Sequence, residues 1–318
     1  MLPRRPDMLS PHSDKESRPR DAGSAIPRNR TMLRKFDLPR SIVTAIAFSG
    51  IWLMVFIVVF LLKEGLPILK AASIAELAAG ELWYPASEPP LYGMLPLLLG
   101  SASVTILSAL ITVPFGVATA LFLSDICPKP AVEFGKALIE VFGFLPSVVL
   151  GFIGMAIVAP YLQIEFELLS GLNMLNASFL LGILVFPTIV TLSEESLRAV
   201  PQSLRDASYA LGATRFETLS KVVLPGAARG VAHAAILGVM RAIGETMVVL
   251  MASGGAAVIP ESLFDPVRPL TSTIAAEMGE TPVDSPHYQA LFFMGCLLLG
   301  FTLALNTLVG KLESRGRR

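Results

Sequence analysis

Cysteine and histidine are scarce in this 318-residue chain, and their scarcity excludes several classes of protein. The two cysteines, Cys127 and Cys296, are too few for a disulfide framework or a zinc site. The three histidines, His12, His233 and His287, have no partner at metal-binding or catalytic spacing. We therefore expect no resident metal and no enzymatic site in this chain.

A nucleotide-binding loop is also missing from the sequence. No segment matches Gly-x-x-x-x-Gly-Lys-Ser/Thr, the pattern whose backbone amides hold the phosphates of ATP. We therefore expect no cofactor in this chain. Any process driven by ATP would need a separate subunit that binds ATP and magnesium.

Charged residues are few, at 16% of the chain, whereas 53% of the residues are hydrophobic. An ordinary soluble domain is about one quarter charged. The apolar residues gather into six runs, at about 41–62, 94–123, 137–159, 172–192, 230–252 and 288–308. Each run has about 20 residues or more, enough to cross a hydrocarbon core of about 30 Å as a helix. This pattern predicts an all-α polytopic membrane protein with six transmembrane helices.

The positions of Lys and Arg predict the orientation of these helices. Of the 25 basic residues, 21 lie in the first 40 residues, in the loops after the second and fourth runs, or in the C-terminal tail. Because cytoplasmic segments carry the excess of Lys and Arg, we expect both termini in the cytoplasm. Residues 1–35 are basic, rich in Pro and Ser, and without apolar periodicity, which predicts a disordered cytoplasmic tail before a membrane domain at 36–318.

The long loop at 193–229, on the predicted cytoplasmic side, carries local signals for two short helices. Pro201 suits the first turn of one helix, and Gly212 suits its C-terminal end. Thr214 and Glu217 have the spacing of a capping box for the second helix. We expect Pro225 to end that second helix.

A longer motif runs through the same loop. It consists of Asp206-Ala207-Ser208, three residues, Gly212, nine residues, and Val222-Val223-Leu224-Pro225. This spacing resembles the EAA loop of bacterial ABC importer permeases, Glu-Ala-Ala, three residues, Gly, nine residues, Ile-x-Leu-Pro. The resemblance implies a coupling helix that docks into a cleft of an ATPase subunit, with a turn at the glycine.

The fifth run contains two charged residues, Arg241 and Glu245. A charge at the centre of a membrane helix costs about 2.5–3.5 kcal/mol on insertion scales. Residues four apart share one face of a helix, so one interpretation is an ion pair that fixes helix packing. The other is a polar transport path, in which Arg241 binds an oxyanion such as phosphate, Glu245 holds Arg241, and Thr246 adds a hydroxyl.

The segment RAIGETMVVLMASG, residues 241–254, is similar to R-A-x-G-E-T-M-A-V-x-M in the C-type permease of phosphate-specific ABC importers. Segments 93–125, 146–152 and 187–201 resemble the same family. The resemblance covers about residues 36–312. It implies a role in phosphate passage for Arg241 and Glu245.

The same resemblance implies a set of partners and a location. These are a homologous A-type permease, two copies of an ATP-binding subunit, an extracytoplasmic phosphate-binding protein, and the lipid of a bacterial inner membrane. No nucleic-acid partner is expected. Two alternatives stay open: a permease for another oxyanion, such as molybdate, tungstate, sulfate or phosphonate, and a membrane component that mainly senses phosphate and signals.

Overall fold

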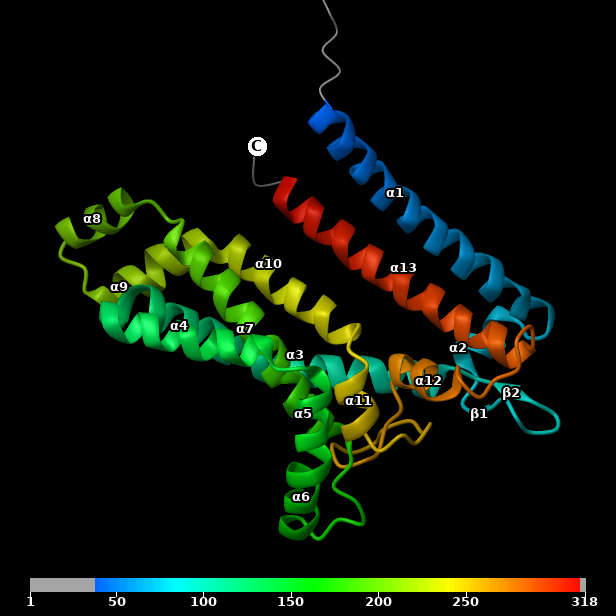
Figure 1. Cartoon of the computed structure of the whole chain (residues 1–318). Coiled ribbons are helices and arrows are strands. Elements are labelled where there is room, and N and C mark those ends of the chain that lie inside the picture. The colour runs from blue at the N-terminus through cyan, green and yellow to red at the C-terminus, as the bar shows by residue number, and fades with distance from the viewer. Residues whose placement is uncertain (1–37, 315–318) are drawn as a thin grey trace, which may run out of the picture. The chain divides into compact units, whose positions relative to one another are not determined.

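The computed structural model describes residues 38–314, so the tail expected at 1–35 lies outside the described residues. Helix α1 (Leu38–Gly65) begins in one compact unit, Met1–Ile51, and ends in a second, Trp52–Arg318. Every other described element belongs to the second unit (Figure 1).

Among residues 38–314, six helical segments are long and apolar enough to cross a membrane, as the composition predicts. They are Ile42–Lys70, Leu95–Ile126, Ser147–Glu165, Met174–Arg198, Arg215–Ile243 and Pro286–Thr307. The fourth is the most enclosed, because 61% of its most apolar window is buried. In the first segment, none of the corresponding window is buried. The fourth segment, α7, is therefore the central helix of the second unit.

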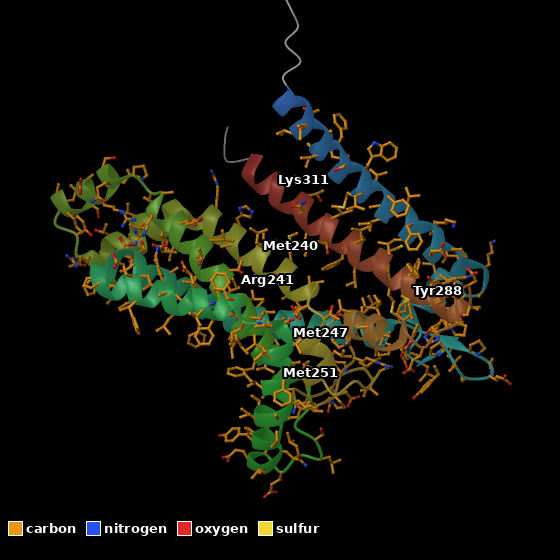
Figure 2. All side chains as sticks on the ribbon, in the orientation of Figure 1. Met240, Arg241, Met247, Met251, Tyr288 and Lys311 are labelled. Carbon is orange, nitrogen blue, oxygen red and sulfur yellow. The ribbon has the colours of Figure 1, made fainter. Side chains whose placement is uncertain are left out.

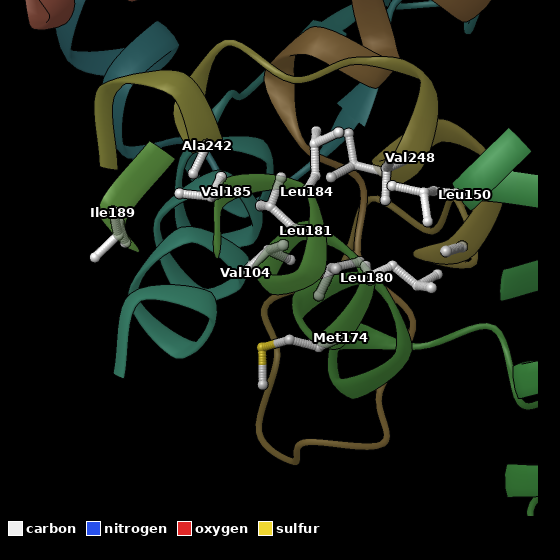
Figure 3. Close-up of a cluster of buried hydrophobic side chains, with 14 residues drawn as sticks. Val104, Leu150, Met174, Leu180, Leu181, Leu184, Val185, Ile189, Ala242 and Val248 are labelled. Atoms are coloured by element: carbon white, nitrogen blue, oxygen red, sulfur yellow. The ribbon is translucent and has the colours of Figure 1, made fainter. Parts of the chain in front are cut away.

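The main core lies where α7 (Met174–Arg198) packs against α3 (Leu95–Leu121) and α10 (Leu224–Ile243). Figure 3 shows its buried side chains, which include Val104, Leu181, Leu184, Val185 and Ile189. Glycines allow this close approach: a Cβ atom added to Gly238 would lie 2.7 Å from Cγ1 of Ile189. Small residues at helix crossings are typical of membrane bundles, where close packing replaces the hydrophobic effect.

The third expected span, 137–159, differs in the structure because the helix is broken at Leu145 and Pro146. Helix α4 (Lys129–Phe144) ends before the break, and α5 (Ser147–Ile153) begins after it. A π turn (Gly154–Val158) then leads into α6 (Ala159–Glu165), so the membrane segment is Ser147–Glu165. Proline explains the break, since it disfavours helical backbone at the residue before it.

The fifth expected span, 230–252, also differs at both ends. At its start, α9 (Arg215–Thr218), a π turn (Leu219–Val223) and α10 follow one another without interruption. Our expectation that Pro225 ends a short helix is therefore wrong. Pro225 lies in the first turn of α10, where its missing N–H costs little, and the π turn before it bonds Leu224 N–H to Leu219 O.

At the other end of the fifth span, α10 stops at Ile243, and α11 (Met247–Ala252) is a separate short helix. Beyond it, α12 (Leu270–Glu277) packs against both α11 and α13 (Pro286–Ser314). The three residues between α10 and α11 are Gly244, Glu245 and Thr246. Two of the three predicted path residues therefore lie in a helix break and not on a helix face.

A second core forms around a small hairpin. Strands β1 (Trp83–Tyr84) and β2 (Leu91–Tyr92) are antiparallel and pair Trp83 with Tyr92. The 3-10 turn Leu66–Lys70 and helix α2 (Ile74–Ala79) lie before the hairpin in the chain. Their buried side chains meet residues of α3, α12 and α13 in one cluster, which contains Ile68, Leu77, Trp83, Met94, Leu270 and Leu291.

Candidate functional site

Arg241 lies in the last turn of α10, and its side chain is exposed (Figure 2). Its Nη1 atom donates a hydrogen bond to the hydroxyl of Thr188, 3.2 Å away on α7. No carboxylate among the described residues forms an ion pair with it. The guanidinium is therefore oriented by a neutral group and keeps its charge available.

Glu245 does not pair with Arg241, so the first of our two interpretations is wrong. Its carboxylate accepts hydrogen bonds from the backbone N–H groups of Met247, at 3.1 Å, and Val248, at 3.5 Å. The side chain thus caps α11, and a negative group is favourable at that end of a helix. The α10 helix has already ended at Ile243, so Arg241 and Glu245 no longer share a helix face.

Glu245 and Thr246 are both half-buried in the break between α10 and α11. The backbone carbonyl of Glu245 accepts a hydrogen bond from Thr271 of α12, at 2.7 Å, which ties the break to the following helix. Thr246 takes the N-cap position of α11, but its hydroxyl makes no capping hydrogen bond. The three predicted path residues are close in sequence, yet Glu245 and Thr246 shape the break, and Arg241 points toward α7.

The loop between α7 and α10 forms the two helices that the sequence predicts. Helix α8 (Gln202–Ala210) is followed by Gly212, whose φ of +83° favours glycine, and then by α9. Thr214 and Glu217 form both bonds of the predicted capping box. Large apolar side chains on this loop are exposed, namely Leu204, Tyr209, Leu211 and Phe216.

The motif residues of this loop take different places. Asp206 and Ala207 are exposed on α8, and Asp206 accepts a hydrogen bond from Gln202, at 3.0 Å. The hydroxyl of Ser208 lies 2.8 Å from that of Thr218, which joins α8 to α9. Leu224 is half-buried against the cluster around Leu197, Val223 and Ala227, and Pro225 is exposed beside it.

Sequence reasoning missed Arg205, the one buried residue of α8. Its guanidinium donates to the carboxylate of Asp125, at the end of the π turn Phe122–Ile126 that follows α3. It also donates to the backbone carbonyl of Leu197 in α7, at 2.8 Å. No local signal could have revealed this burial, because Asp125 is 80 positions away in the sequence.

Glu194 is a second buried charge that the sequence did not predict. It lies in α7, and its carboxylate accepts a hydrogen bond from Lys136 of α4, at 2.8 Å. It also forms an ion pair with Arg198, one helical turn later. Two partly exposed basic side chains thus neutralise the buried carboxylate of Glu194, as burial of a charge requires.

A third ionic cluster lies beside the hairpin, around Glu277 of α12. Its carboxylate pairs with Arg268 and His287, each at 2.8 Å, and accepts a hydrogen bond from the indole of Trp83 at 3.2 Å. Burial acts to raise the pKa of Glu277, but the hydrogen bond from His287 and the charge of Arg268 outweigh it. The pKa of Glu277 therefore lies below its ordinary value.

Known proteins with similar sequences are membrane transport components. A family described as the inner membrane component of binding-protein-dependent transport systems matches residues 129–318. The probable ABC transporter permease protein YqgH of Bacillus subtilis is 38% identical over 278 residues, which cover 87% of this chain and 90% of that protein. The phosphate transport system permease protein PstC of Mesorhizobium japonicum is 30% identical over 244 residues, covering 71% and 74%.

Solved structures of ABC transporters share the fold. A bacterial alginate ABC transporter chain matches with a TM-score of 0.60 at 11% identity, over 89% of this chain and 97% of that one. A chain of the MetNI methionine ABC transporter matches with a TM-score of 0.53 at 21% identity, over 71% and 99%. At these identities the likeness concerns the fold alone.

Proposed function

The chain belongs to the family of inner membrane components of binding-protein-dependent transport systems, and from this premise we propose that it is the permease subunit of an ATP-driven importer of inorganic phosphate. Relatives named as phosphate permeases, at about 30% identity, support this substrate. The observation that carries the proposal is the state of Arg241. A cation without an acidic partner in an apolar helix is costly, and such a residue points to a functional site.

The geometry of Arg241 suits an oxyanion. A guanidinium presents parallel N–H donors that match two oxygens of a phosphate group. Thr188 takes one of these donors without cancelling the charge. The proposed role of Glu245 changes with the structure: it shapes the helix break through α11 and does not hold the arginine.

The partners remain proposals that follow from this assignment. Because Arg241 is exposed, a second, homologous permease chain would enclose the path on its open side. The exposed apolar residues of α8 and α9 would dock on an ATPase subunit, one of two copies that bind ATP and magnesium. A phosphate-binding protein would deliver the anion from outside. The chain would lie in a bacterial inner membrane, with both termini and the loop that contains α8 on the cytoplasmic side.

We propose that ATP-driven closure of the ATPase pair moves α8 and switches the path between outward and inward access. Phosphate from the binding protein then passes the α10–α11 break and interacts with Arg241. Thr246 lies in this break and offers an uncommitted hydroxyl as a second contact. The chain itself supplies the path, and hydrolysis takes place in the partner.

The test is uptake of radiolabelled phosphate by cells that lack their own importer and express this chain with its partners. The native chain should support uptake, and Arg241→Gln at equal membrane levels should abolish it. Uptake by both proteins would remove Arg241 from the path while keeping the transporter assignment. No uptake by either protein, despite correct insertion, would refute phosphate as the substrate.

A second candidate substrate is another tetrahedral oxyanion, because a single arginine recognises shape and charge shared by several anions. Competition decides between them. Excess unlabelled phosphate should suppress uptake, whereas equal excesses of sulfate, molybdate, tungstate and a phosphonate should leave it unchanged. Stronger suppression by one of those anions would reassign the substrate.

A further inference from the structure

Helix α8 is attached to the membrane helices chiefly through one charged side chain, Arg205. Arg205 is 8% exposed, whereas Leu204 and Tyr209 on the same helix are 49% and 43% exposed. Apolar packing therefore does not hold α8 in place. Among the described residues, the other side-chain hydrogen bond that joins α8 to a different element is the hydroxyl contact between Ser208 and Thr218.

Arg205 contacts two membrane segments at once. One side of its guanidinium reaches Asp125, at the end of the segment Leu95–Ile126, and the other reaches the Leu197 carbonyl of α7. These two segments pack closely along the main core. Thr188, which orients Arg241, belongs to α7 as well. A displacement of Arg205 would thus act on both helices and reach the proposed anion contact through α7.

The physical character of the contact favours transmission of movement. A guanidinium held by two acceptors in different helices has a fixed direction, unlike an apolar contact that can slide. The side chains of Arg205 and Asp125 are only 10% and 17% exposed, so solvent screens their attraction less than that of a surface pair. A cavity of about 610 Å³, lined by Asp125, Arg205, Lys136 and Arg198 among others, adjoins the pair. The pair therefore has space on one side into which it can move.

We propose that the Arg205–Asp125 ion pair, with the Leu197 carbonyl, is the link that passes movement of α8 to α3 and α7. Arg205 and Asp125 are positioning residues that couple ATP hydrolysis to transport, and they do not touch the anion. This inference rests on the proposed function, in which α8 docks on the ATPase.

The experiment uses the complete transporter in proteoliposomes, to which the binding protein and phosphate are added. Two quantities are measured: phosphate imported per ATP hydrolysed, and stimulation of hydrolysis by the binding protein. Asp125→Asn keeps the shape of the side chain but removes its charge. We expect the complex to assemble and to hydrolyse ATP, while phosphate imported per ATP falls about tenfold, within the range of typical coupling energies.

Two further variants complete the test. The exchange Asp125→Arg with Arg205→Asp should recover part of the lost import per ATP, which a purely local packing defect would not do. Lys221→Gln is the matched control, since Lys221 and Glu217 form an exposed pair on the same loop. That variant should leave both quantities unchanged.

Parallel loss of hydrolysis and import in Asp125→Asn, or no change in either, would overturn the link. If Asp125→Asn fails to assemble, Arg205→Lys decides, because lysine keeps the charge but cannot hold both acceptors in one fork. A normal ratio in that variant would overturn the link, and a lowered ratio would support it. Failure of the proposed function would appear differently, as a wild-type complex that imports no phosphate. In that case the link would still be tested by comparing how strongly the binding protein stimulates ATP hydrolysis in the wild type and in the variants.

Discussion

Arg205 and Arg241 both lie near the ends of the membrane segments, yet their guanidinium groups have opposite surroundings. Arg205 is buried and paired with the carboxylate of Asp125. Arg241 is exposed, and its guanidinium donates a hydrogen bond to the hydroxyl of Thr188. Both residues sit in a segment with a family motif, but the sequence singles out only Arg241, because it lies in an apolar run whereas Arg205 lies in a polar loop.

The difference separates two uses of a charge in a membrane protein. The charge of a buried arginine is neutralised by its carboxylate partner, and removing the partner leaves a costly charge inside the protein. An arginine oriented by a neutral hydroxyl keeps both its charge and free N–H donors. This contrast is the basis on which we propose a mechanical role for Arg205 and a substrate-binding role for Arg241.

The largest expected effect concerns Arg241 itself. In Arg241→Gln, uptake should fall about 100-fold or more, the loss typical of removing a donor aimed at an oxyanion. Arg241→Lys should keep about one tenth of the uptake, because an ammonium retains the charge without the planar fork. Initial rates of radiolabelled phosphate uptake measure both. Equal activity of the Lys variant and the native chain would show that charge alone suffices.

The next largest effect tests whether the ionic cluster around Glu277 stabilises the folded protein. Glu277→Gln removes the charge that Arg268 and His287 share. At neutral pH this change should destabilise the protein by about 2 kcal/mol, measured by thermal unfolding in detergent. Uptake per folded protein should stay near the native value. A large loss of uptake without a loss of stability would move Glu277 into the transport path.

The same variant has a pH dependence with a defined sign. The pKa of Glu277 is lowered in the folded state, so its stabilisation is present above the unfolded value of about 4.3 and lost as pH falls through the folded value. The difference in unfolding temperature between the native chain and Glu277→Gln should therefore shrink below about pH 4. A difference that grows on acidification would contradict the charge assignment.

A smaller effect is expected at Thr188, which belongs to the Arg241 side of the comparison. Thr188→Val keeps the shape but removes the hydroxyl that orients the guanidinium. Loss of one such hydrogen bond, about 1 kcal/mol, should lower uptake about fivefold. Thr188→Ser should restore it. If Val and Ser variants behave alike, the hydroxyl has no part in orienting Arg241.

The smallest effect is expected in the loop with α8 and α9. Thr214→Ala removes the cap of α9, which is typically worth about 1 kcal/mol to its helix. Amide hydrogen exchange should accelerate in residues 215–218 and stay unchanged in the core of α7. Because α9 continues into α10, uptake should change less than twofold.

Much of this structure is encoded by local signals. Six apolar runs give six membrane segments, and the pair Thr214 and Glu217 forms the capping box that its spacing predicts. Gly212 makes its turn with the left-handed backbone that favours glycine. In each case the residues that determine the local structure lie within a short stretch of the chain, so the structure can be predicted from the sequence.

The errors have the opposite character. The helix break at Gly244 arises because the carboxylate of Glu245 bonds to the amides of α11, while the Glu245 carbonyl bonds to Thr271 of α12. Arg205 is buried because α3 brings Asp125 beside it. Competition between distant partners decides both features, and spacing along one helix cannot show which partner wins.

The most direct test of the account is a double-mutant cycle on phosphate uptake with Arg241→Gln, Glu245→Gln and the double variant. Glutamine at 245 keeps an oxygen that accepts from the α11 amides, so Glu245→Gln alone should have a modest effect. If Arg241 is free of Glu245, the two effects should add, with a coupling energy below about 0.5 kcal/mol. A double variant that recovers uptake, or a coupling energy above about 1.5 kcal/mol, would contradict the account and restore the ion pair.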